Sequence, residues 1–155
     1  KLYKQVVVCD EWLNFQNFAE WYCENTYMFY KFGITPNLDK DLFSNESRGN
    51  LYSPKTCCII PTIINCAISE SRETNSVTNG ITIRGNKYKV NVMHKYKNLC
   101  LGLFVTKELA ENAYREKKKE VIRLLANEYR YIINDITYNK LINWEPKLAS
   151  ENFNE

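Results

Sequence analysis

The chain has 155 residues, of which 45% are hydrophobic and 25% charged, and its formal net charge is +3. That length suffices for one compact domain or two small ones, and the composition is ordinary for a globular protein. No apolar run approaches the roughly 20 residues that cross a bilayer, which excludes a membrane-spanning helix and predicts no membrane partner.

Cysteine usage favours a reducing compartment. The six cysteines form no Cys-x-x-Cys pair, and His94 is the only histidine. A structural zinc site needs four such ligands in short, paired spacings. We therefore expect no metal site, no cofactor and six reduced thiols in a cytoplasmic protein.

The first half of the chain predicts helices separated by loops. Aromatic residues recur at helical spacing over residues 9–25, which indicates an amphipathic helix with its stripe in the core. Residues 26–50 contain glycine, proline and a polar run, and we expect them to be irregular. A short helix is predicted over residues 61–67. The polar residues 69–79 are expected to connect two modules.

The second half changes to the period of a β-strand. Residues 81–84 and 87–92 alternate apolar and polar side chains around a Gly85-Asn86 turn, and residues 99–103 form a third strand. Thr106 is predicted to cap a helix that runs to about residue 128. The apolar stripe that packs this helix on the sheet is expected to be Leu109, Ala110, Ala113, Tyr114, Val121, Leu124 and Leu125.

Residues 78–128 also hold the excess positive charge, with eleven basic residues against five glutamates. Antiparallel strands fit the DNA major groove, where lysines contact phosphates and Arg or Asn side chains reach base edges. The predicted DNA-binding residues are Arg84, Lys87, Lys89 and Asn91 on the open face of the sheet, with Lys95 and Lys97 on phosphates. The alternatives are a solvated helix face and a sheet face that is merely hydrated.

Three segments of this half resemble a known DNA-binding family. GNKYKVNV at residues 85–92, LGLF at 101–104 and TKELAENAY at 106–114 are similar to the ethylene-response-factor (APETALA-type) domain. The resemblance implies a three-stranded sheet that is packed on one helix and docks in the major groove of double-stranded DNA.

The first half resembles bacteriophage proteins of the HNH-type endonuclease class. The similarity lies in VCDEWLNFQNF at residues 8–18, LDKD at 38–41 and GNLYSPKTCC at 49–58. An APETALA-type domain often follows in those proteins. The resemblance implies a phage protein in the cytoplasm of an infected bacterial host. It predicts an α+β fold with a degenerate HNH-like module (1–70), a connecting segment (71–77), the DNA-binding domain (78–128) and an extension (129–155) that packs back on the body.

An HNH nuclease needs a histidine general base, and residues 38–41 contain none. We therefore expect a DNA-binding protein without cleavage, in which Asp39 and Asp41 cap turns. The alternative is a metal-dependent endonuclease in which Asp39, Asp41 and Asn65 hold Mg²⁺.

A third hypothesis is binding to a host defence nuclease, as an inhibitor. The aromatic-rich residues 21–32 hold more rings than one helix face can bury. Phe29, Tyr30 and Phe32 are predicted either to anchor such an interface or to line the core shared by the two modules. The oligomeric state stays open.

Overall fold

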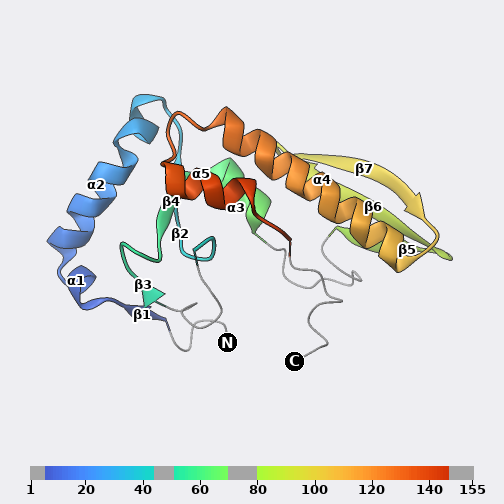
Figure 1. The fold of residues 1–155 in the computed structure, drawn as a ribbon, viewed down its shortest axis with the longest axis horizontal. Helices are drawn as coiled ribbons and strands as arrows, with labels where there is room; N and C mark the ends of the chain where they lie inside the picture. The colour runs from blue at the N-terminus through green and yellow to red at the C-terminus, as the bar shows by residue number, and fades with distance from the viewer. Residues whose placement is uncertain (1–5, 44–50, 70–79, 147–155) are drawn as a thin grey trace. The chain divides into compact units, whose positions relative to one another are not determined.

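The computed structural model describes residues 6–43, 51–69 and 80–146 and confirms the expected α+β class (Figure 1). The chain divides into two compact units. Described residues up to Asn65 form the first unit together with Tyr129–Leu141, and the rest form the second. The predicted connecting segment 71–77 lies outside the described residues. Within the described part of the chain, no helix combines the length and apolar character needed to cross a membrane.

The first unit begins with two helices, so the prediction of one helix over residues 9–25 is wrong. Helix α1 (Asp10–Leu13) and helix α2 (Phe15–Lys31) are separated by Asn14, whose backbone is extended. The Asn14 side chain accepts a hydrogen bond from the Gln16 N–H at 3.0 Å. Asparagine is among the preferred N-cap residues, so this contact ends α1 and starts α2.

Helix α2 also continues beyond its predicted end, which corrects the expectation that residues 26–31 are irregular. Phe29 extends the apolar face of the helix and is only 1% exposed. The helix ends before Gly33, which has a φ of +66°, and the Ile34 N–H donates to the Phe29 carbonyl at 2.8 Å. This glycine-based stop is typical of helix C-termini.

Two short pairs of strands complete the first unit. Strand β1 (Val7–Val8) pairs in parallel with β3 (Leu51–Tyr52), and β2 (Pro36–Asp39) pairs antiparallel with β4 (Cys58–Pro61). Helix α3 (Thr62–Ile68) follows β4 directly, one residue later than predicted.

Helix α5 (Asp135–Ile142) lies in the C-terminal extension, and all of the helix except Ile142 belongs to the first unit. Ile132, Ile133 and Leu141 of this extension are buried. Tyr131 and Ile136 of the same extension are more than half exposed.

The second unit contains the predicted three-stranded antiparallel sheet, in the order β5-β6-β7. Its strands are β5 (Ile81–Arg84), β6 (Lys87–His94) and β7 (Lys97–Phe104). Lys95 and Tyr96 form the second turn with φ values of +49° and +63°. Positive φ at both central residues suits a two-residue hairpin, which is why β7 begins earlier than residue 99.

Helix α4 (Lys107–Glu128) packs along one face of this sheet (Figure 1). Thr106 caps it as predicted, because its Oγ1 accepts the Leu109 N–H at 3.2 Å. The predicted stripe needs correction: Leu109 and Leu124 are about half exposed, whereas Glu111 and Lys118 are buried. The core between helix and sheet is formed by Ile81, Val90, Val92, Ala110, Tyr114, Val121, Ile122 and Leu125.

Candidate nucleic-acid interface

The face of the sheet opposite α4 carries the predicted DNA-binding side chains. Successive side chains of a strand point to opposite faces, and Val90 and Val92 of β6 are buried toward the helix. Lys87, Lys89 and Asn91 alternate with them on the open face. The strand register adds Thr82 beside Lys89 and Arg84 beside Lys87. The structure thus brings the four predicted sheet residues to one face.

Two cations of this face are direct neighbours across the first hairpin. Arg84 of β5 is the cross-strand partner of Lys87 of β6, and both are exposed. Like charges directly opposite each other in a sheet are destabilising. Within the described residues, no carboxylate forms an ion pair with Arg84, Lys87 or Lys89. A bound polyanion would relieve the repulsion between these cations.

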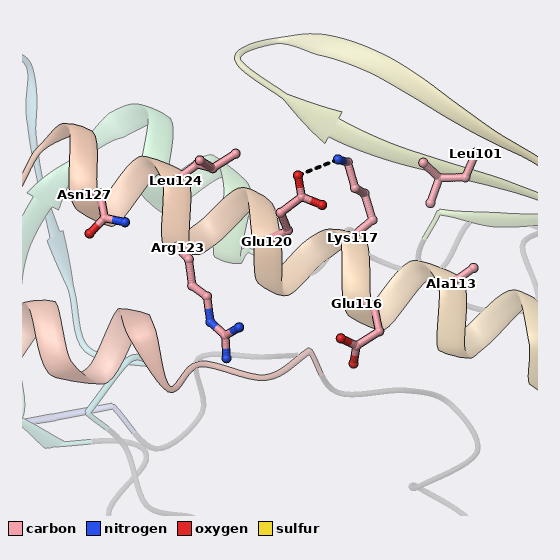
Figure 2. A pocket seen from close by; sticks show the side chains of 8 residues that line it. All are labelled: Leu101, Ala113, Glu116, Lys117, Glu120, Arg123, Leu124 and Asn127. Atoms are coloured by element: carbon pink, nitrogen blue, oxygen red, sulfur yellow. Dashed lines mark hydrogen bonds and ion pairs between the residues drawn. The ribbon is translucent and has the colours of Figure 1, made fainter.

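The cations of α4 differ, because several of them are paired within the second unit. Lys117 contacts Glu120 at 2.7 Å, the interaction drawn in Figure 2, and Lys119 contacts Glu145 at 2.7 Å. Lys107 lies 3.4 Å from Glu111, and the Arg123 Nε donates to a backbone carbonyl. Lys107, Lys117 and Lys119 of the helix thus have acidic partners, whereas Arg84, Lys87 and Lys89 of the sheet have none within the described residues.

Lys95 and Lys97 do not join the open-face cluster. Lys95 lies in the second turn, at the other end of β6 from Lys87, and forms an ion pair with Glu128 at 2.9 Å. His94 lies two residues after the buried Val92 on β6 and therefore belongs to the face that α4 covers. Lys97 is the cross-strand partner of His94, so it belongs to that face as well. Lys95 and Lys97 both remain exposed at the far end of the hairpin, where they form a separate basic position.

A β-bulge adds a residue to the open face that the sequence pattern does not predict. Val90 pairs with Gly102, but Asn91 pairs with Cys100, so Leu101 is the extra residue of β7. An extra residue shifts the following side chains to the other face. Leu103 consequently lies beside Lys89, and it is 55% exposed. Strict alternation over residues 99–103 would place Leu103 in the core. Gly102, the residue after the bulge, has a φ of +127°.

The predicted interaction residues Phe29, Tyr30 and Phe32 separate into two classes. Phe29 is buried, so it belongs to the core of the first unit and its role as an exposed anchor is excluded. Tyr30 is 62% exposed and Phe32 49% exposed. The Phe32 ring meets that of Tyr131 edge-on, with centroids 5.0 Å apart, and the Tyr30 hydroxyl lies 3.4 Å from that of Tyr22. This hydrogen bond raises the pKa of Tyr22 to about 12.

The candidate nuclease residues lie around strands β2 and β4 of the first unit. Asp39 ends β2 and accepts the Leu42 N–H at 2.8 Å, which is the turn-capping role expected in the absence of cleavage. Asp41 is exposed and forms an ion pair with Lys40. Asn65 lies in α3, directly after β4. Within the described residues, no cluster of three His, Cys, Asp or Glu side chains is arranged to hold a metal ion.

Burial raises the pKa of the Asp39 carboxyl above its ordinary value. A raised pKa means that the folded state favours the protonated carboxyl, so the ionised form destabilises the fold at neutral pH. We expect Asp39→Asn, which keeps an acceptor for the Leu42 N–H, to raise the melting temperature at pH 7. The gain should vanish below about pH 4, where Asp39 is protonated in both states.

Thermal unfolding followed by circular dichroism at both pH values measures this effect. Asp41→Asn is the matched control, because that carboxylate is exposed, and we expect it to give no gain. A stabilisation by Asp39→Asn that is equal at both pH values would contradict the prediction.

No family model, curated protein or solved structure matches this chain.

Proposed function

We propose that this protein binds double-stranded DNA through the open face of the β5-β6-β7 sheet, without cleaving it. The observation that carries the proposal is a set of three cations on this face, the exposed Arg84 and Lys87 and the half-buried Lys89, none of which has an acidic partner among the described residues. The resemblance to the APETALA-type domain supports the same surface. An antiparallel ribbon enters the major groove, and its lysines contact the flanking phosphates.

The test is a mobility-shift titration with duplex DNA over a range of salt concentrations. Phosphate contacts release counterions, so the affinity should fall steeply with salt. Lys87→Ala/Lys89→Ala should weaken binding on the order of tenfold and reduce the slope of log K against log salt by about 2. The slope of log K against log salt is measured for the wild type and for the double variant.

Lys117→Ala/Lys140→Ala is the matched control for this titration. It removes the same charge from two helices, outside the open face, and replaces both residues with a good helix former. The control should bind like the wild type. Equal losses in the two double variants, or no binding at low salt, would overturn the proposal.

The exposed rings of Tyr30, Phe32 and Tyr131 favour a second candidate function, which is binding to a host defence nuclease. Aromatic side chains are enriched at the centres of protein interfaces. Binding to a nuclease would use residues of the first unit, whereas DNA binding uses residues of the second. A substitution can therefore abolish one function and leave the other intact.

A further inference from the structure

The open face of the sheet combines its cations with apolar and amide side chains. Met93 and Leu103 are 50% and 55% exposed, and both lie on the same face of the sheet as Lys89. Asn91 lies between Lys89 and Met93 on β6. Its backbone N–H donates to the Gly80 carbonyl at 2.8 Å, and its side-chain amide makes no hydrogen bond within the described residues.

The register places these side chains at useful spacings. Residues two apart on a strand are separated by about 6.8 Å, which equals about two base-pair steps of DNA. Lys89, Asn91 and Met93 therefore follow one another along β6 at that interval. Leu103 stands beside Lys89 on the neighbouring strand, because the bulge at Leu101 moves it there.

These side chains have the chemistry that recognises A·T pairs in the major groove. Adenine offers the N7 acceptor and N6 donor that an Asn amide matches with two hydrogen bonds, and thymine offers a C5 methyl group for apolar contact. In a G·C pair, guanine is read by Arg or Lys, and cytosine by a carboxylate that accepts from its N4 amine. The exposed cations Arg84 and Lys87 lie at the hairpin end of the strands, away from Asn91. Among the described residues of the open face, none is Asp or Glu.

We infer that this face discriminates A·T from G·C pairs, with Asn91 on adenine and Leu103 against the thymine methyl. The inference rests on the proposed DNA-binding function and deepens it. Arg84 and Lys87 then lie at the end of the sheet, where paired cations suit phosphates, so Asn91 of β6 and Leu103 of β7 supply the sequence preference.

The first experiment compares three duplexes of alternating sequence, dA·dT, dG·dC and dI·dC, in mobility-shift titrations at one salt concentration. Inosine presents the major groove of guanine but lacks its minor-groove amine, so dI·dC separates reading of the two grooves. The wild type should bind dA·dT about tenfold more tightly than either other duplex. Asn91→Ala should reduce this ratio, whereas Asn112→Ala on α4 should leave it unchanged.

The second experiment replaces thymine by uracil in the dA·dT duplex, which removes only the C5 methyl groups. Affinity should fall about fourfold for each methyl group contacted. The difference should disappear in Leu103→Ala and persist in Leu109→Ala, a leucine of similar exposure on α4.

Four results are decisive for these two proposals. An A·T preference that is sensitive to uracil and lost in the Asn91 and Leu103 variants supports the inference. Equal, salt-dependent binding to all three duplexes overturns it and leaves the DNA-binding proposal standing. Equal binding to dA·dT and dI·dC also overturns it, since the preference then comes from the minor groove. Absence of binding to every duplex at low salt overturns both proposals.

Discussion

Replacement of Phe29 by alanine should lower the free energy of unfolding by about 3–5 kcal/mol, the usual effect of removing a buried phenylalanine ring. Phe29 is 1% exposed on helix α2, which packs against strands β2 and β4 of the first unit. Deletion of the ring leaves a cavity that the surrounding strands fill only in part. Urea unfolding followed by far-ultraviolet circular dichroism measures the loss.

Tyr30→Ala is the matched control for this prediction. It removes an aromatic ring from the neighbouring position of the same helix, but that ring is 62% exposed. We expect its effect on the free energy of unfolding to stay within about 0.5 kcal/mol. Comparable losses in the two variants would contradict the burial of Phe29. A stable Tyr30→Ala protein is also the reagent with which binding to a host nuclease can be examined.

The second unit is predictable because its local signals agree with its tertiary structure. Period-two alternation, the Gly85-Asn86 turn and the Thr106 cap each specify a boundary within a few residues. The same alternation correctly places Lys87, Lys89 and Asn91 on one face. These are the parts of the candidate site that follow from the sequence.

The errors arise where a non-local or single-residue event decides the structure. The bulge at Leu101 reverses the face of Leu103, and no pattern of apolar residues reveals it. Lys95 forms an ion pair with Glu128, a residue 33 positions away, which no local motif indicates. Helix α2 carries aromatic residues on several faces, so periodicity alone does not separate buried Phe29 from exposed Tyr30.

The start of β5 gives the prediction that connects the fold most directly with the site. Gly80 has a φ of +73°, and a Cβ atom there would lie inside van der Waals contact with the Asn91 backbone oxygen and 2.5 Å from Cε2 of Tyr114. We expect Gly80→Ala to lower the free energy of unfolding by about 2–4 kcal/mol, from left-handed strain together with overpacking. Because Gly80 also accepts the Asn91 N–H, DNA affinity should fall as well.

Gly85→Ala separates strain from overpacking. Gly85 has a φ of +59°, but a Cβ there meets nothing within 4 Å, so only the strain of about 1 kcal/mol should remain. Chemical denaturation of the two variants in parallel measures the difference. The excess loss in Gly80→Ala reports the close approach of β5 to Asn91 and Tyr114. Equal losses in the two variants would mean that this close approach is absent.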